Sequence, residues 1–238
     1  MRPYIICHMG TSIDGRLHPS RFTLPAKGIS RDVLRGHYER VHDQFNADGW
    51  IVGRVTMSEM AKGKERSVKD APRVERKAHM AARNGRKLAI GIDPSGRVHY
   101  GKDNVGGDHA VAVLREGVSD AYLAELREDG VSYVFAGPKG DDLSRAMEEV
   151  ALLFDIKKLV LEGGGRINGA FFKLKLIDEF STLIHPAVDG VSGGQSIMDY
   201  DGPEGDRPGI GQSLRLTHCE TLEGGMVWLR HAVEPAPG

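Results

Sequence analysis

The stretch Lys158–Pro186, KLVLEGGGRINGAFFKLKLIDEFSTLIHP, carries the pattern that decides the fold. An apolar run at Leu159–Leu161 meets three consecutive glycines, Gly163–Gly165, and a helix-like segment and a second β-type run follow. This order predicts a strand, a tight turn, a helix and a strand. Consecutive glycines are typical of turns that need positive φ or close approach of a ligand. Because a helix begins directly after them, its free N–H groups and positive dipole end favour an anion such as a pyrophosphate.

The common nucleotide-binding motifs do not match this turn. The Rossmann fingerprint counted from Gly163 needs a glycine at the sixth position, where the chain has Asn168. It also needs an acidic residue at the end of the next strand, whereas Asp178 and Glu179 stand at its start. The Gly-Lys-Ser/Thr of a Walker loop is absent. A nucleotide at this turn therefore implies another architecture, and a helix-entry loop without a ligand is the alternative.

Outward from this stretch, strands and helices alternate as far as Pro186, which predicts a largely parallel sheet. Strands are expected at Pro3–Met9, Trp50–Val52, Lys87–Ile92, His109–Leu114, Val131–Ala136, Lys158–Leu161, Glu179–His185, Ser213–Thr221 and Met226–Ala232. Helices are expected after a Ser30 cap, with Leu34, Tyr38, Val41 and Phe45 as its apolar positions, and at Thr56–Ala61, Asp120–Asp129 and Asp141–Phe154. The turn Leu222–Gly225 adds an antiparallel hairpin. We expect one α/β domain over residues 1–238.

Composition narrows the class of partner. The formal net charge of −1 argues against nucleic acid or an anionic membrane as the main partner. Basic residues concentrate at Lys62–Lys87, where ten Lys or Arg stand against three acidic residues. We interpret the tract from Lys62 to about Arg86 as a long solvated surface loop, and the alternative is a positive rim that attracts a phosphorylated ligand.

Cysteine usage and the terminal sequence indicate a cytoplasmic protein. Cys7 and Cys219 are far apart in apolar, strand-like runs, so both are expected to be buried free thiols. The N-terminal apolar run is too short for a signal peptide, and no stretch approaches membrane-spanning length. No HExxH motif or Cys/His cluster occurs, so no metal is expected.

Two further motifs follow predicted strands. Gly53-Arg54-Val55-Thr56 places an arginine and a hydroxyl at a helix start, which suits an anion. Together with the glycine triplet, this second turn could hold the other end of a dinucleotide. After the first strand, Ser12 and Asp14 bring a hydroxyl and a carboxylate to the carboxyl end of the sheet. An Asx turn in which Asp14 caps Gly15 and Arg16 is the alternative.

These motifs together resemble the reductase domain of riboflavin biosynthesis, the RibD C-terminal type, which has the dihydrofolate reductase fold. The resemblance rests on Ser12-Ile13-Asp14-Gly15, Asp48–Gly53 with Thr56, Leu161–Gly165 with Asn168-Gly169, Ile177-Asp178-Glu179 and Pro186. It spans nearly the whole chain. It implies an α/β fold with a mostly parallel central sheet flanked by helices and a C-terminal antiparallel hairpin.

The same resemblance implies an NADPH-dependent oxidoreductase and assigns roles to individual residues. The implied cofactor contacts are Gly53, Arg54, Thr56, Asp93, Ser95, Arg97, Gly163, Gly164, Gly165, Arg166, Ile167 and Asn168. Arg54 is implied at the pyrophosphate or the 2′-phosphate, Asp93 at the adenosine ribose, and Ser95 and Arg97 near the 2′-phosphate. Ser12, Asp14 and Glu162 are implied on the substrate side. A small-molecule substrate and a homodimer are also implied.

Reduction of a C=N or C=O bond needs a proton as well as a positioned hydride donor. Asp14 and Glu162 are the candidate catalytic residues, and Asp14 is preferred as proton donor. Glu162 is expected to hydrogen-bond a substrate amine or hydroxyl, and the alternative is a carboxylate satisfied by backbone N–H groups.

The chain departs from the family after Thr56. The riboflavin enzymes typically continue as Asp-Asp-Pro-x-Leu-Thr, but this chain has Met57–Lys64 without that acid, proline or Leu-Thr. Lys64, or Lys62 or Arg66, is therefore expected to bind a substrate phosphate instead. The expected substrate is a phosphorylated ribosylamino-pyrimidine. The alternatives are a family reductase acting on a different small substrate and an NADP-binding sensor without turnover.

Overall fold

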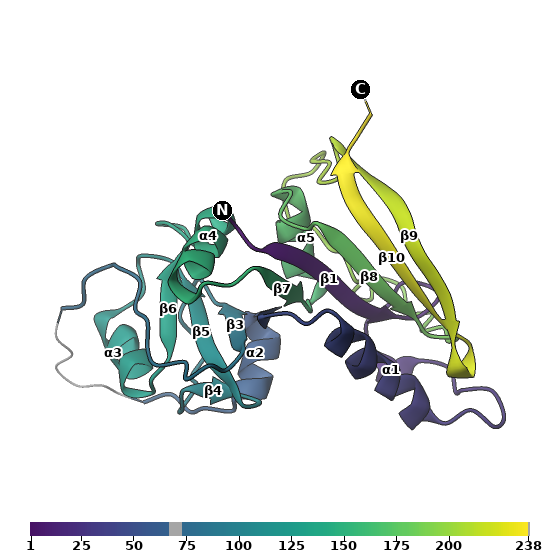
Figure 1. Cartoon of the computed structure of the whole chain (residues 1–238), viewed down its shortest axis with the longest axis horizontal. Helices are drawn as coiled ribbons and strands as arrows, with labels where there is room; N and C mark the ends of the chain where they lie inside the picture. The colour runs from purple at the N-terminus through teal and green to yellow at the C-terminus, as the bar shows by residue number, and fades with distance from the viewer. Residues whose placement is uncertain (67–72, 238) are drawn as a thin grey trace. The chain divides into compact units, whose positions relative to one another are not determined.

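The computed structural model describes residues 1–66 and 73–237 (Figure 1). The chain divides into two compact units, each built from separate stretches of sequence. Unit 1 contains Met1–Pro3 and Ala47–Leu159, and unit 2 contains Tyr4–Asn46 and Val160–Gly238. Strand β7 (Lys158–Leu161) carries the chain from the first to the second. The single domain expected from the sequence stays a prediction.

Unit 1 is built on a parallel sheet. Its strands are β2 (Gly49–Gly53), β3 (Leu88–Ile92), β5 (Asp108–Leu114) and β6 (Ser132–Phe135), each parallel to the next, and the short β4 (Asn104–Val105) is antiparallel to β5. Every residue of β3 is buried, as continuous apolar strands of a covered parallel sheet are. The helices are α2 (Arg54–Ala61), α3 (Asp120–Glu128) and α4 (Leu143–Phe154).

Unit 2 combines parallel and antiparallel pairing. Strand β1 (Tyr4–Thr11) is parallel to β8 (Glu179–Ile184), β10 (Met226–Pro235) is antiparallel to β8, and β9 (Gln212–Leu222) is antiparallel to β10. The helices are α1 (Arg31–Gln44) and α5 (Gly165–Lys173), with short 3₁₀ turns η1 (Pro19–Arg21) and η2 (Glu223–Gly225). A long loop of residues 185–211 connects β8 to β9 without a helix or strand among its described residues.

The helix caps explain where most helices begin. Ser30, Ser119 and Asp142 accept hydrogen bonds from backbone N–H groups in the first turns of α1, α3 and α4. Helices α2 and α5 instead begin after Gly53 and Gly164, and neither glycine can supply a capping side chain. Their first N–H groups therefore receive no bond from the side chain at the cap position.

The expected fold class is confirmed: an α/β fold with mostly parallel pairing and a C-terminal antiparallel hairpin. All predicted strands and helices are present with boundaries shifted by up to three residues, while β4 and η1 were not predicted. Part of the predicted loop between Lys62 and Arg86, at residues 67–72, lies outside the described residues.

The expected burial of both cysteines is wrong for Cys219. Both thiols are free and Cys7 is buried, but Cys219 is exposed on β9. Strand β9 pairs with β10 along one edge, and most of its residues remain in contact with solvent on both faces. The alternation of apolar residues in the sequence could not show that Cys219 is exposed. A strand at the edge of a sheet with no covering layer can have the same apolar residues as a half-buried strand.

Candidate active site

Glu162, directly after β7, is mostly buried among polar side chains in unit 2. Its carboxylate accepts a hydrogen bond of 3.0 Å from the Tyr38 hydroxyl, and its Oε1 lies 4.0 Å from Nε2 of His42. The Glu162 side chain keeps 19% of its surface exposed. Burial raises the pKa of the Glu162 carboxyl, and His42 and the Tyr38 hydroxyl act in the opposite direction. A carboxyl with a raised pKa keeps its proton to a higher pH than a solvent-exposed carboxyl does.

The neighbouring groups can accommodate either protonation state of Glu162. The Tyr38 hydroxyl is within hydrogen-bond distance of both the Glu162 carboxylate and the His8 carbonyl oxygen at 3.1 Å. One hydroxyl has one proton, so Tyr38 can donate to ionised Glu162, or donate to His8 and accept from protonated Glu162. Burial raises the pKa of Tyr38 well above its ordinary value, which keeps the hydroxyl protonated. The alternative expected from the sequence was a Glu162 carboxylate bonded to backbone N–H groups, but its hydrogen-bond donor in the structure is the Tyr38 hydroxyl.

The structural requirement for glycine differs among the three positions after Glu162. Gly163 has a φ of 89°, and a Cβ there would lie 2.9 Å from the Met9 side chain. At Gly165 a Cβ would lie 2.2 Å from the Ser196 carbonyl oxygen, because the loop of residues 185–211 packs against the start of α5. Thus the backbone conformation and packing require glycine at both positions whether or not a ligand binds.

Gly164 has neither restriction. Its φ of −65° is open to any residue, and a Cβ there would meet nothing within 4 Å. Open space therefore lies beside the first turn of α5. The side chain of Asn168 in the same turn is fully buried, donating to the Ile197 carbonyl oxygen at 2.8 Å, while its Oδ1 has no hydrogen-bond partner among the described residues. An uncapped helix start with an unpaired amide oxygen is suited to an anionic ligand with hydrogen-bond donors.

Arg166, which is exposed in the first turn of α5, forms an ion pair with Asp201 at 3.4 Å. Both side chains are more than 70% exposed, so this pair contributes little to stability. The guanidinium is therefore able to exchange partners. Ile167 is half-buried and continues the first turn of α5.

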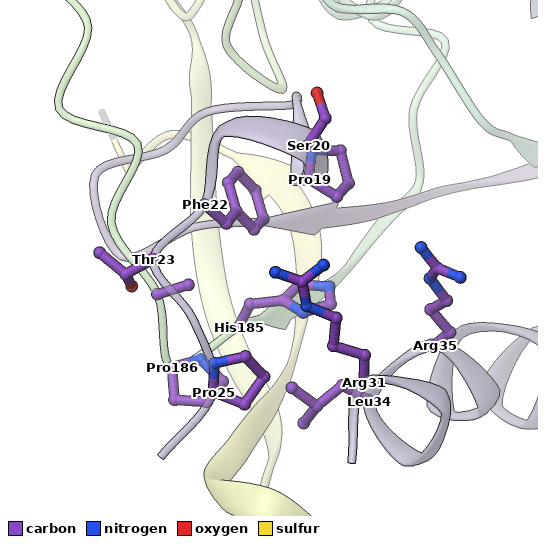
Figure 2. Close-up of a pocket in the computed structure, with 11 residues that line it drawn as sticks. Pro19, Ser20, Phe22, Thr23, Pro25, Arg31, Leu34, Arg35, His185 and Pro186 are labelled. Atoms are coloured by element: carbon purple, nitrogen blue, oxygen red, sulfur yellow. The ribbon is translucent and has the colours of Figure 1, made fainter. Parts of the chain in front are cut away.

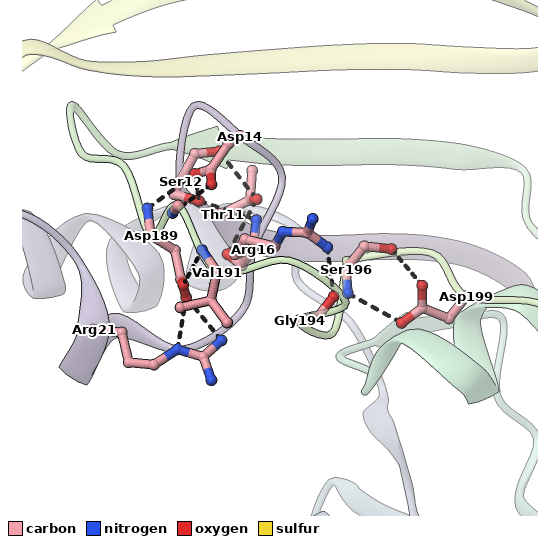
Figure 3. A network of polar contacts seen from close by, with 11 residues as sticks. Thr11, Ser12, Asp14, Arg16, Arg21, Asp189, Val191, Gly194, Ser196 and Asp199 are labelled. Atoms are coloured by element: carbon pink, nitrogen blue, oxygen red, sulfur yellow. Dashed lines mark hydrogen bonds and ion pairs between the residues drawn. The ribbon is translucent and has the colours of Figure 1, made fainter.

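Asp14, in the loop after β1, is held by a network of hydrogen bonds (Figure 3). Its carboxylate accepts from the Ser12 hydroxyl at 2.6 Å and from the backbone N–H groups of Asp189 and Gly190 at 3.0 and 2.8 Å. These bonds, the Ser12 bond foremost, hold the pKa of the Asp14 carboxyl well below its usual range. Asp14 thus fastens two loops together as an ionised group, whereas the Asx turn considered from the sequence would have bonded it to Gly15 and Arg16.

In unit 1, Gly53, Arg54 and Thr56 form the start of α2. Gly53 occupies the N-cap position, and Arg54 and Thr56 are half-buried in the first turn. No hydrogen bond or ion pair engages the Arg54 guanidinium among the described residues. An unpaired guanidinium beside an uncapped helix start is chemically suited to a phosphate.

Asp93, Ser95 and Arg97 share the turn after β3. Asp93 is fully buried, and its carboxylate accepts from the backbone N–H groups of Arg97 and Val98 at 2.5 and 2.8 Å. Its role is thus to shape the turn that presents Ser95 and Arg97, which are both exposed. The contact between Asp93 and a ribose stays a prediction.

The basic residues after α2 differ in their availability. Arg66 forms an ion pair with Asp129, and Lys62 ends the helix in the left-handed conformation. Lys64 is exposed. Within the described residues, no group of three or more His, Cys, Asp or Glu side chains is arranged to hold a metal ion, and no helix is long and apolar enough to cross a membrane.

Comparison with known proteins places this geometry in a family. The family model described as the RibD C-terminal domain matches residues 3–228. The chain belongs to the RibD C-terminal domain family. It is 27% identical over 209 residues to 2,5-diamino-6-ribosylamino-4(3H)-pyrimidinone 5′-phosphate reductase of Methanothermobacter thermautotrophicus, with 85% of this chain and 86% of that protein covered.

Solved structures agree with this fold. The pyrimidine reductase-like protein of Corynebacterium diphtheriae superposes with a TM-score of 0.69 at 16% identity, covering 98% of this chain and 93% of that one. The riboflavin biosynthesis reductase Rib7 of Saccharomyces cerevisiae gives 0.57 at 16% identity, with 98% and 90% covered. The resemblance stated from the motifs is confirmed. This member of the RibD C-terminal domain family is an oxidoreductase by the family match and by its similarity to the pyrimidinone phosphate reductase of Methanothermobacter thermautotrophicus.

Sequence reasoning missed the partners of Glu162. Tyr38 is one of the apolar positions predicted for α1, and His42 is not among the candidate site residues. The available signal was the spacing of Arg31, Arg35, Tyr38 and His42, which places four polar or amphipathic side chains on one face of a helix.

Proposed function

We propose that this family member is an NADPH-dependent reductase that transfers hydride to a C=N or C=O carbon of a ribosylamino-pyrimidine phosphate. The observation that carries the proposal is the buried Glu162 carboxyl, bonded to Tyr38 and followed at once by the open, uncapped start of α5. The substrate is inferred from the relative, which is named for reduction of such a compound.

The residues present fit the cofactor. Within unit 2 we assign Gly164, Arg166, Ile167 and Asn168 as cofactor contacts, with Gly163 and Gly165 shaping the turn. Within unit 1, taken by itself, we assign Gly53, Arg54, Thr56, Ser95 and Arg97 as candidate phosphate contacts, with Asp93 shaping the turn. The supporting observations are two helix starts without side-chain caps and the unpaired Asn168 Oδ1. NADPH supplies the hydride when bound.

Glu162 is the better proton source of the two candidate carboxyls. Its pKa is raised by burial, whereas the hydrogen bonds to Asp14 keep that carboxyl ionised and occupied. Glu162 would hold the proton on its carboxyl oxygen and release it toward the reduced centre, with Tyr38 bonding the carboxylate that remains. Asp14 and Ser12 would position the loop on the substrate side.

The deciding experiment measures NADPH oxidation by the purified protein with 2,5-diamino-6-ribosylamino-4(3H)-pyrimidinone 5′-phosphate. A rate of NADPH oxidation that rises with the concentrations of both NADPH and the pyrimidinone phosphate would support the proposal. Oxidation with other carbonyl or imine compounds only would favour a family reductase with a different substrate. Tight NADPH binding without turnover of any of them would favour a sensor, and failure to bind NADPH would overturn the assignment.

We also propose a homodimer formed through β9. Leu214 and Leu216 project from this edge strand at 53% and 54% exposure, and their spacing of two places them on one face. Light scattering should give a dimer mass for the wild type and a monomer for Leu214→Glu/Leu216→Glu. Leu152→Glu, at an 83% exposed leucine of α4, is the matched control and should stay dimeric.

A further inference from the structure

A cavity in unit 2 lies beside α1, and none of the residues assigned above to the cofactor or to catalysis lines it. Its volume is about 300 Å³, and Arg31 and Arg35 of α1, Phe22 of the loop after β1, and His185 after β8 contribute to its wall. Figure 2 shows the Arg31 guanidinium next to the His185 ring in this view, with Phe22 above both and Arg35 farther along α1. The cavity therefore combines two fixed positive charges with aromatic rings.

Neither arginine has an anionic partner among residues 1–66 and 73–237. Both side chains are exposed, and neither forms a hydrogen bond or ion pair with any residue that the structure describes. They are four residues apart on α1, a spacing at which like charges face one another and destabilise a helix. An anion between them would offset this repulsion and accept hydrogen bonds from both guanidinium groups.

The remaining walls suit the sugar part of such an anion. Phe22 and His185 meet edge to face with ring centroids 5.7 Å apart, and prolines at positions 19, 25 and 186 add rigid apolar surface. Burial lowers the pKa of His185, so its ring is neutral at pH 7 and offers one hydrogen-bond donor and one acceptor. The positive charge of the cavity thus comes from the arginines.

The cavity lies on the same side of α1 as the Glu162 site. Arg31, Arg35 and Tyr38 follow one another at spacings of four and three residues, which places them on one helix face. Arg31 and Tyr38 are about 10 Å apart along the helix axis at 1.5 Å per residue. At Gly10, a Cβ would lie 3.4 Å from His185 Nε2 and 3.7 Å from the Tyr38 ring. His185 and Tyr38 therefore border the same space.

We propose that this cavity binds the phosphate of the substrate, with Arg31 and Arg35 as the phosphate ligands and His185 and Phe22 against the ribose. The inference rests on the proposed function, because it assumes that Glu162 and Tyr38 mark the end of the substrate that is reduced. It also transfers the phosphate contact from Lys64, which the sequence suggested, to two arginines on the helix that carries Tyr38.

The test compares Arg31→Gln/Arg35→Gln with wild type on two substrates, the ribosylamino-pyrimidine 5′-phosphate and its dephosphorylated form. Loss of charged hydrogen bonds should raise KM for the phosphorylated compound about 10- to 100-fold and leave KM for the dephosphorylated one unchanged. NADPH affinity should not change. Lys27→Gln removes an exposed charge that does not line the cavity and should leave both KM values unchanged. This control separates direct contact with the phosphate from long-range attraction by positive charge.

A binding measurement separates this proposal from the proposed function. Ribose 5-phosphate is titrated into the wild type and the double variant, with calorimetry as the readout and Lys64→Gln as a second comparison. Binding that disappears only in the arginine variant supports the cavity even if no pyrimidine is reduced. Equal KM values of variant and wild type for the phosphorylated compound, with turnover intact, would overturn the cavity and leave the reductase. Loss of binding in Lys64→Gln alone would return the phosphate to Lys64.

Discussion

Two loops of unit 2, Ser12–Arg16 after β1 and Glu162–Gly165 after β7, both place a carboxylate directly beyond a strand, but their carboxylates differ. Asp14 receives three hydrogen bonds and is held ionised, whereas Glu162 is mostly buried, has one hydroxyl partner and has a raised pKa. The first loop uses its polar groups within the fold. The second retains groups available for a ligand. Acidic residues at equivalent positions in a sequence can thus differ in role because of their hydrogen-bond partners.

The largest effect is expected at Gly164. Gly164→Asp should weaken NADPH binding about 10³-fold, because a like charge beside the pyrophosphate costs several kcal/mol. The backbone angles and free space at this position accept a side chain, so the variant should fold. Calorimetric titration with NADPH measures the effect, and an unchanged affinity would mean that the turn has no ligand.

Gly165→Ala is the matched comparison within the same turn. Its Cβ would overlap the Ser196 carbonyl oxygen, so this variant should lose about 1–3 kcal/mol of folding free energy. Gly164→Ala should retain the stability of the wild type. Equal destabilisation of the two alanine variants in urea denaturation would contradict the different reasons given for the two glycines.

Glu162→Gln should reduce kcat about 10²-fold and leave NADPH affinity nearly unchanged, since general acid catalysis is lost without a cofactor contact. In the wild type, kcat should fall as pH rises through the raised pKa of Glu162, and the variant should lose this alkaline limb. At neutral pH the Glu162→Gln variant should be as stable as the wild type or more stable, because burial disfavours the ionised form of Glu162. A variant with full activity would remove Glu162 from the mechanism.

Asp14→Asn should lower the melting temperature and have a smaller effect on kcat than Glu162→Gln. The pKa of Asp14 is depressed in the folded protein, so its stabilisation is present above the unfolded pKa of about 3.9 and is lost as pH falls toward the folded value. The difference in melting temperature between variant and wild type should therefore narrow below pH 4. If turnover falls with no change in melting temperature, Asp14 has the catalytic role expected from the sequence.

Tyr38→Phe should give the smallest effect, a loss of about 5-fold in kcat, as expected for one hydrogen bond of about 1 kcal/mol. The Tyr38 hydroxyl lowers the pKa of Glu162, so its removal should move the alkaline limb of the kcat profile to higher pH. A shift to lower pH would show that Tyr38 stabilises the protonated carboxyl instead.

The sequence predicted the order of elements and the two glycine-started helices, because apolar periodicity and turn residues are local signals. It did not predict the preference for Glu162 over Asp14. That preference depends on Tyr38, 124 residues away, and on the backbone N–H groups of Asp189 and Gly190, which no local pattern reveals. The sequence also predicts Gly165 as a cofactor contact. It could not show that the packing of Ser196 against Gly165 requires glycine there, because this contact is visible only in three dimensions.

The contrast between the two thiols provides an experimental handle. Cys219 is exposed on β9, while Cys7 is buried and its pKa is raised by that burial, so a maleimide dye should label the folded protein at one position. That position lies on the same strand as Leu214 and Leu216. Fluorescence from a dye at Cys219 should therefore test the proposed dimer directly, without any substitution being introduced.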